Sequence, residues 1–280
     1  MSKIGIQEIA RLANVSIGTV DRALHGRKDI SEVTRRRILR IAKDLGYKPN
    51  LAARALSVGG PAIRIGVCLP RELHYFYDQV RSGRLAEARR VEQRGVDIVY
   101  RPVERLGSGE VERIKDLLAD RVQVLTVCPG DPKALAPVIN AAEEKNIRVI
   151  CVATDAAASH RSTVVCVDPE VNGRLAAELM AKFLAPDSEV AVITGMFQTE
   201  DHRKKVEGFS AAFPEFCPGG KVVEVVEGHD SEEETFRKVF ALLERRKNLK
   251  GIYVSTANCL PVCHALGAKG LYGAIKLITT

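Results

Sequence analysis

The chain has 280 residues, of which 46% are hydrophobic, 28% charged and 5% aromatic, and 42 basic against 35 acidic side chains give a net charge of +7. This composition is typical of a soluble globular protein, and the length indicates about two domains. Because no apolar run approaches the ~20 residues of a membrane span and the first residues lack the apolar core of a secretory signal, we expect a cytoplasmic protein without a membrane segment.

The seven cysteines favour free thiols over a disulfide framework. Their number is odd, and most lie in or beside apolar runs, where a free cysteine behaves as a small hydrophobic residue. Cys259, Cys263 and His264 resemble part of a metal site, but no second ligand pair stands at a zinc-like spacing. We therefore expect neither a metal nor a cofactor.

The surplus of positive charge is confined to the first fifth of the chain. Residues 1–60 hold 12 basic and five acidic side chains, whereas the remaining 220 residues hold 30 of each. A small basic module on a neutral body is the electrostatic footprint of a protein that binds a polyanion. A solvated basic helix face has the same composition, so charge alone leaves both interpretations open.

Three short helices are predicted within the first 45 residues. Apolar residues recur at helical spacing in residues 6–13, 17–24 and 32–45. Ser16 and Ser31 stand before the second and third of these segments, where a hydroxyl caps the free N–H groups of a helix. Two helices joined by a tight turn, with a third that buries their apolar faces, form a helix-turn-helix.

The second of these helices would enter the major groove of DNA with its N-terminal end. Four residues would be exposed there: Ile17, Gly18, Asp21 and Arg22. Arg22 is the candidate for base readout, since its forked guanidinium matches the two major-groove acceptors of guanine. The hydroxyls of Ser16 and Thr19 suit phosphate oxygens, which position a protein without reading sequence. A plain three-helix bundle with incidental arginines stays open as the alternative.

After residue 60 the periodicity changes to strands that alternate with helices. The expected strands are residues 63–69, 96–100, 122–127, 148–153, 163–167, 190–194, 222–226, 251–254 and 274–278. The expected helices between them include residues 76–94, 110–119, 134–145, 171–184 and 232–246. This alternation predicts an α/β fold with a doubly wound parallel sheet, in which ligands bind beyond the C-terminal ends of the strands.

No enzyme signature is found in the sequence. Phosphate-binding glycine loops, a nucleophile elbow and a zinc-protease motif are all missing. His229, Asp230 and Ser231 are the residue types of a catalytic triad, but three consecutive loop residues cannot converge as a triad does. We therefore expect a protein that is not an enzyme.

The N-terminal module resembles the headpiece of the lactose-repressor (LacI/GalR) family of bacterial transcriptional regulators. The resemblance rests on residues 9–24 (IARLANVSIGTVDRAL), on Ser31, Thr34, Arg35, Arg37 and Ile38, and on residues 45–56 (LGYKPNLAARAL). It implies that residues 1–48 bind DNA through Ser16, Ile17, Gly18, Thr19 and Arg22. It also implies that residues 49–60 form a hinge helix and linker whose Asn50, Ala53, Arg54 and Leu56 contact the operator, with Leu56 wedged into the minor groove.

Residues 61–280 resemble the periplasmic sugar-binding-protein fold that serves as the sensor in the same family. The resemblance implies two lobes, about 61–167 and 168–280, and a sugar or polyol effector between them. The implied ligand-binding residues follow strands: Phe76, Tyr77, Asp155, Arg203 and Asn258. Carboxylate, amide and guanidinium groups flanked by aromatic rings suit the hydroxyls and apolar faces of a sugar. Structural roles stay open, with Phe76 in the core, Asp155 capping a turn and Arg203 at the surface.

The resemblance further implies a homodimer on a double-stranded operator at the nucleoid, with the final sensor segment missing from this chain. Asp168 and His202 are secondary candidates for the ligand site. The main rival is a sugar-binding protein or sugar-processing enzyme with an incidental basic N-terminus. A third possibility is a DNA-binding protein whose sensor does not respond to ligand.

Overall fold

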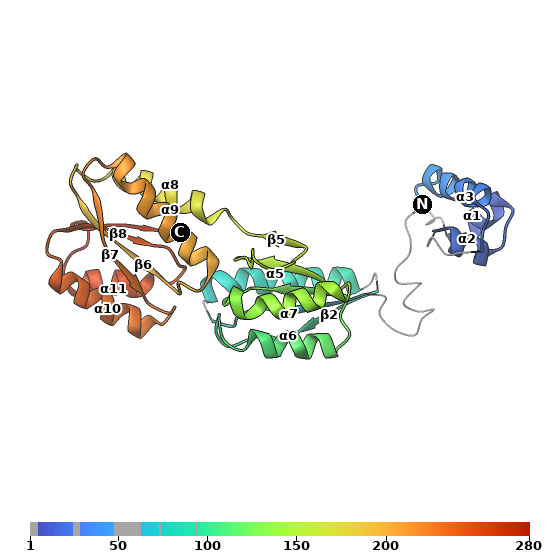
Figure 1. The fold of residues 1–280 in the computed structure, drawn as a ribbon, viewed down its shortest axis with the longest axis horizontal. Helices are drawn as coiled ribbons and strands as arrows, with labels where there is room; N and C mark the ends of the chain where they lie inside the picture. Colours follow the sequence, from blue (N-terminus) through green and yellow to red (C-terminus); the bar gives the residue numbers. More distant parts are fainter. Residues whose placement is uncertain (1–4, 25–28, 48–62, 73, 93–94) are drawn as a thin grey trace. The chain divides into compact units, whose positions relative to one another are not determined.

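A computed structural model describes residues 5–24, 29–47, 63–72, 74–92 and 95–280. The chain divides into two compact units at Ala62 and Ile63, and each is described by itself (Figure 1). None of the helices described is long and apolar enough to cross a membrane.

The N-terminal unit contains the three expected helices, α1 (Ile6–Ala13), α2 (Ile17–Leu24) and α3 (Glu32–Asp44). Their apolar faces form one core, with these residues buried: Ile9, Ala10, Ala13, Val20, Ala23, Ile38 and Ala42. Asn14 ends α1 with a φ of 49°, in the left-handed region that asparagine tolerates better than most residues. The turn at residues 14–16 then leads directly into α2, which confirms the predicted helix-turn-helix.

Two serine caps define the starts of α2 and α3. The Oγ of Ser16 accepts a hydrogen bond from the backbone N–H of Thr19 at 3.1 Å, and the Oγ of Ser31 accepts one from the N–H of Thr34 at 3.2 Å. Each cap satisfies one of the backbone donors that a helix leaves unpaired in its first turn. The two caps therefore fix where α2 and α3 begin.

We expect Ser16→Ala to destabilise α2 by about 1 kcal/mol, because the variant leaves that donor without its acceptor. The measurement is amide hydrogen exchange of residues 17–24 in the whole chain, which should accelerate roughly five-fold for exchange by local opening. Ser16→Asn, which retains a capping oxygen, should exchange like the parent. Unchanged exchange in Ser16→Ala would show that the cap contributes nothing.

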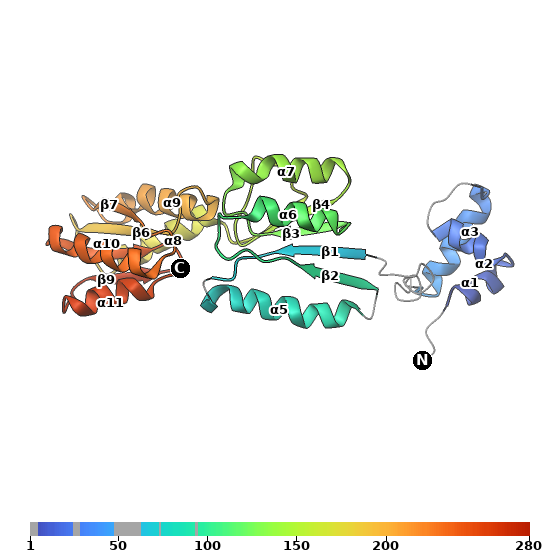
Figure 2. The same cartoon turned by 90° about the horizontal axis from the view of Figure 1, so that it is seen from below.

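The first lobe of the second unit is a five-stranded parallel sheet in the order β2-β1-β3-β4-β5. Its strands are β1 (Ile63–Cys68), β2 (Val96–Tyr100), β3 (Val124–Val127), β4 (Arg148–Val152) and β5 (Thr163–Val165). Helix α5 (His74–Glu92) covers one face, and α6 (Glu110–Ala119) and α7 (Pro132–Glu144) cover the other (Figure 2). Because both faces are covered, the central strands are nearly continuous apolar runs.

The second lobe is a four-stranded parallel sheet in the order β7-β6-β8-β9. Its strands are β6 (Glu189–Thr194), β7 (Lys221–Glu227), β8 (Leu249–Val254) and β9 (Lys276–Thr279). Its helices are α8 (Pro169–Ala181), α9 (Glu200–Phe216), α10 (Glu232–Arg245) and α11 (Leu260–Ala268). Successive residues of β6 alternate between two cores: Val190 and Val192 pack with α8 and α9, whereas Ala191 and Ile193 pack with α10 and α11. The predicted doubly wound α/β fold is confirmed.

Two glycines allow α8 and α9 to approach closely. A Cβ added at Gly173 would lie 2.2 Å from the carbonyl oxygen of Lys205, and one at Gly208 would lie 2.3 Å from that of Glu170. Both distances fall far inside van der Waals contact, and backbone atoms cannot move aside as a side chain can. The spacing of the two helices therefore depends on the absence of side chains at both positions.

We expect Gly208→Ala to lower the free energy of unfolding by about 1–3 kcal/mol, because the added methyl group forces the helices apart. Urea unfolding followed by circular dichroism measures this change. Gly83→Ala in α5 is the matched control, since no described atom lies within 4 Å of the added methyl group. Alanine should stabilise that exposed helix position by about 0.5–1 kcal/mol. Similar curves for the two variants would contradict the packing argument.

Candidate functional site

Helix α2 has one buried face and one exposed face. Val20 and Ala23 are buried, whereas Ser16, Gly18 and Arg22 are exposed and the side chain of Ile17 is 47% exposed. These exposed residues are the ones expected to face DNA. Their arrangement leaves the N-terminal end of α2 free to enter a groove.

Two polar residues of α2, Thr19 and Asp21, are half-buried. Thr19 is half-buried, with its hydroxyl 2.9 Å from that of Ser16. Asp21 is also half-buried. The pKa of the Tyr47 hydroxyl is raised, first by burial and then by the negative charge of Asp21. The carboxylate of Asp21 therefore lies beside the C-terminal end of α3, and the expectation that it is fully exposed is wrong.

Helix α3 adds an exposed basic surface to the same unit. Arg36, Arg37, Arg40 and Lys43 are exposed, and Arg36 forms an ion pair with Glu32 at 3.4 Å. Exposed cations of this kind attract the phosphate backbone without regard to base sequence. The expected hinge contacts Asn50, Ala53, Arg54 and Leu56 lie outside the described residues.

The two aromatic candidates in the first lobe have different environments. Phe76 is 42% exposed, and its ring packs edge-on against that of Tyr77, with the centroids 4.9 Å apart. Tyr77 is buried, its hydroxyl lies 3.0 Å from the Sγ of Cys128, and burial raises the pKa of that hydroxyl well above its ordinary value. Only Phe76 therefore offers an exposed aromatic face in this conformation, and Tyr77 supports it from the core.

Asp155 has an extensive local hydrogen-bond network. Its two carboxylate oxygens accept hydrogen bonds of 2.7 Å each from Nε and Nη2 of Arg161, and Oδ1 accepts a third from the N–H of Ala156. These donors, Arg161 first, hold the pKa of Asp155 below its ordinary value. Asp155 is thus an ionised acceptor whose orientation Arg161 fixes.

The second-lobe candidates lie on α9, at the start of α8 and just after β8. Arg203 donates to both carboxylate oxygens of Glu207, at 2.7 and 2.9 Å. The buried His202 accepts a hydrogen bond at Nδ1 from the N–H of Met196 at 2.9 Å. Asn258 is buried just after β8, whereas Asp168 accepts hydrogen bonds from the first turn of α8 and is its N-cap.

The N-terminal end of α9 joins the two lobes. Thr199 donates its hydroxyl to the carbonyl of Gly130 at 2.8 Å, and the N–H of Asp201 donates to the Oγ1 of Thr154 at 3.2 Å. Met196 packs into the same buried cluster as Tyr77 and other first-lobe residues. These contacts lie where strands of both lobes end, which is where the fold predicts a ligand.

The sequence did not single out Thr154, Thr199 or Asp201. Thr199 and Asp201 stand at the start of a helix directly after β6, and Thr154 follows β4, so each occupies a strand-end position. That position was the available signal, but which of these groups meet across the lobes depends on the packing of residues 47 and 69 positions apart.

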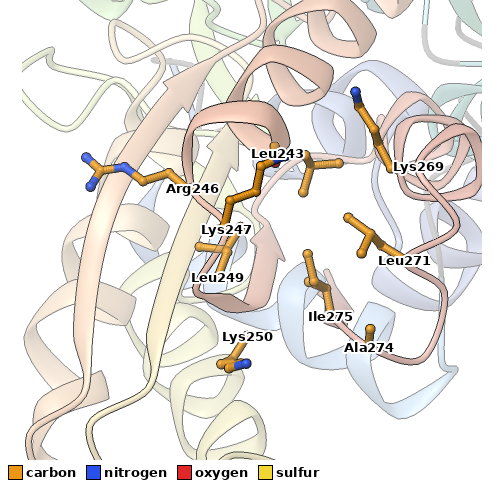
Figure 3. A pocket seen from close by; sticks show the side chains of 9 residues that line it. All are labelled: Leu243, Arg246, Lys247, Leu249, Lys250, Lys269, Leu271, Ala274 and Ile275. Atoms are coloured by element: carbon orange, nitrogen blue, oxygen red, sulfur yellow. The ribbon is translucent and has the colours of Figure 1, made fainter.

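A separate hollow of about 220 Å³ lies in the second lobe, near the start of β8. It is lined by Leu243, Arg246, Lys247, Leu249, Lys250, Lys269, Leu271, Ala274 and Ile275 (Figure 3). The guanidinium of Arg246 points away from the hollow, and Arg246 and Lys269 form ion pairs with Glu224 and Glu244. These cations do not converge on a ligand, and the hollow is remote from the C-terminal ends of the strands.

Residues 5–50 match the family described as bacterial regulatory proteins, lacI family, and residues 65–280 match the periplasmic binding protein domain. The body of the chain belongs to the periplasmic binding protein domain family. It follows a lacI-family helix-turn-helix domain, and this pair of domains supports a role as a DNA-binding transcriptional regulator.

Two relatives and one solved structure show how far the similarity reaches. Catabolite control protein A of Priestia megaterium is 25% identical over 274 residues, which cover 96% of this chain and 79% of that protein. The D-ribose/D-allose-binding protein of Pseudomonas aeruginosa is 25% identical over 178 residues, or 61% of this chain and 55% of that protein. A solute-binding protein of Burkholderia graminis C4D1M in complex with D-arabinose has a TM-score of 0.70 at 26% identity, covering 78% of this chain and 75% of that one.

Proposed function

We propose that this protein binds a specific operator as a homodimer and that a small sugar or polyol, held where the strands of the two lobes end, changes its affinity for that operator. The solvent-facing α2, capped at Ser16 and exposing Ile17, Gly18 and Arg22, is the observation that carries the proposal. Two such helices related by a two-fold axis fit a pseudo-palindromic site. Such a protein acts in the cytoplasm, at the nucleoid.

The sugar part of the proposal rests on the body and on its relatives. The relatives named for or solved with ribose, allose and arabinose share this fold with the chain. The half-exposed ring of Phe76 and the oriented carboxylate of Asp155 lie in the first lobe, and Arg203 and Asn258 follow strands of the second. Aromatic faces and bidentate polar groups are what sugar recognition needs.

Coupling between effector and operator requires that the effector bind two conformations with different affinities. The bonds between Thr199 and Gly130 and between Asp201 and Thr154 link the lobes in the conformation described. A ligand that also contacts both lobes would favour this conformation over one in which the bonds are broken. We propose that this shift alters the presentation of the headpieces, and that the regulator acts as a repressor.

A gel-shift assay of the whole chain tests the proposal, with DNA from its own promoter region as the probe and an excess of unrelated DNA as competitor. The probe should stay shifted under competition, and at least one sugar or polyol in a panel with D-ribose, D-allose and D-arabinose should change the shift. Loss of the shift to any competitor would favour the rival, a sugar-binding protein or enzyme with an incidental basic N-terminus. A specific shift that no panel member alters would favour an unresponsive sensor.

A further inference from the structure

Asp230 is a buried carboxylate in a strained loop just after β7. Asp230 is only 7% exposed. Both His229 and Asp230 have a φ of 51°, which lies in the left-handed region. Residues other than glycine rarely adopt this region, and two in succession are unusual. Strain of this kind persists where the surrounding structure enforces it, often at ligand sites.

Only one of the two oxygens of Asp230 has a partner among the described residues. Oδ1 accepts a hydrogen bond of 2.6 Å from the hydroxyl of Thr256. Oδ2 is buried and accepts no hydrogen bond from any residue that the structure describes. A buried carboxylate oxygen without a donor is unfavourable, so this atom is prepared to accept a hydrogen bond from a ligand.

The absence of a side chain at Gly195 makes room for Oδ2. A Cβ at Gly195 would lie 2.7 Å from that oxygen and 2.4 Å from Cε1 of His202. Because Nδ1 of His202 accepts from Met196, it has no proton to donate to Asp230 in the neutral ring. Nδ1 of His202 therefore does not satisfy Oδ2.

A first-lobe carboxylate, that of Glu72, interacts electrostatically with Asp230. Burial raises the pKa of Glu72, and the charge of Asp230 raises it further. Glu72 accepts a hydrogen bond from the N–H of Leu106 at 2.6 Å and a long one of 3.4 Å from the exposed Arg105. The pKa of Tyr77, raised mainly by burial, is raised further by the negative charges of Asp230 and Asp201. The negative charge of Asp230 is therefore felt by groups of the first lobe.

The cations at the start of α9 are each paired with a carboxylate of the same helix. Lys205 forms an ion pair with Asp201 at 3.0 Å, and Lys204 forms one with Glu200 at 2.6 Å. Arg203 donates to Glu207. A negatively charged group of a ligand at Oδ2 of Asp230 would be repelled by that carboxylate, because none of the ion pairs among the described residues involves Asp230 and buried charges are poorly screened.

We propose that Asp230, assisted by Glu72, determines the class of effector: it accepts a hydroxyl hydrogen from an uncharged sugar and excludes sugars that carry a phosphate. This inference rests on the proposed sugar-sensing function and specifies it. A hydroxyl that donates to a carboxylate forms a charge-assisted hydrogen bond, whereas a phosphate in the same position is repelled and has no donor to offer when fully ionised.

Matched pairs of sugars test the selectivity on the whole, unmodified chain. Isothermal titration calorimetry compares D-ribose with D-ribose 5-phosphate, D-arabinose with D-arabinose 5-phosphate and D-allose with D-allose 6-phosphate. We expect at least one uncharged sugar to bind and its phosphate to bind on the order of 100-fold more weakly. A phosphate that binds as tightly as its parent sugar, or more tightly, would overturn the selectivity while leaving sugar sensing intact. Binding of no member of either series would overturn the proposed function and this inference together.

The variant Asp230→Asn tests the residue itself. It preserves shape but removes the charge, so affinity for the uncharged sugar should fall by about 10- to 100-fold and the disadvantage of the phosphate should shrink. Asp116→Asn, an exposed position in α6, is the control and should bind like the parent. Unchanged affinity in Asp230→Asn would overturn the assignment. If Asp230→Asn does not fold, as judged by circular dichroism, Glu72→Gln takes its place and should bind the phosphate at least several-fold more tightly than the parent does; no gain there would also overturn it.

Discussion

Replacing Arg22 by alanine should weaken operator binding by about 1–3 kcal/mol for each headpiece that carries the change. The side chain is exposed on α2, whose inner face is held by Val20 and Ala23, so the guanidinium is free to pair with a guanine. The loss should concentrate at one base pair of each half-site, and the variant should discriminate less at that position. Fluorescence anisotropy with the operator and a series of single-base variants measures both effects.

Two controls separate base readout from simple loss of charge. Arg22→Lys keeps the charge but loses the fork, so it should retain nonspecific binding and lose most of the discrimination. Arg90→Ala removes another exposed arginine, from α5, where it pairs with Glu87, and should leave operator affinity unchanged. An equal loss on operator and unrelated DNA in Arg22→Ala would assign the residue to the phosphate backbone.

Phe209→Ala should lower the free energy of unfolding by about 3–5 kcal/mol, because it removes a fully buried ring from the second lobe. The ring stacks on Tyr253 with the centroids 4.6 Å apart and on Phe213 at 5.6 Å. Its loss leaves a cavity beneath α9, the helix whose N-terminal end joins the lobes. Urea unfolding measures the change in stability, and calorimetric titration should show weaker sugar binding.

The exposed Phe183 supplies the control for this change. It follows α8 with a side chain largely in solvent, so Phe183→Ala should change stability by no more than about 0.5 kcal/mol. A loss in Phe209→Ala no larger than in this control would contradict the assignment of Phe209 to the core.

The headpiece was the part most readily predicted from sequence. The starts of α1 and α2 and the end of α1 lie where the apolar spacing and the Ser16 cap placed them. These signals act within one or two turns of a helix, so they need no knowledge of tertiary structure. Asp21 is the exception, since its half-buried place beside Tyr47 depends on how α2 packs against α3.

The strands of the body were also predictable, but α9 was not among the expected helices. Its buried residues include Glu200, His202 and Lys205, so its buried face lacks the continuous apolar pattern that predicts an amphipathic helix. Glu200 accepts a hydrogen bond from the N–H of Ala157 in the first lobe, whereas His202 and Lys205 have partners in the second lobe, Met196 and Asp201. A pattern based on hydrophobicity alone therefore misses a helix whose buried face includes paired polar groups.

The candidate ligand residues illustrate the same limit. Sequence placed Asp155 and Asn258 at strand ends, and the structure has them there. The sequence gave no indication that Arg161 would orient Asp155 or that the Tyr77 hydroxyl would form a hydrogen bond with the Sγ of Cys128. From the sequence, Asp230 was considered only as a member of a catalytic triad that its position excludes. Its environment depends on Thr256, which bonds to Oδ1, and on Gly195, which leaves space beside Oδ2, and both are distant in sequence. The ligand roles themselves remain predictions.

The central claim is that α2 reads base edges in the major groove, and dimethyl sulfate protection of the promoter DNA tests it most directly. The reagent methylates the N7 of guanine, the same major-groove atom that a forked arginine contacts. We expect the whole chain to protect one guanine in each of two symmetric half-sites, and Arg22→Ala to restore methylation there while other contacts persist. Guanines that react equally in free and bound DNA would contradict the account.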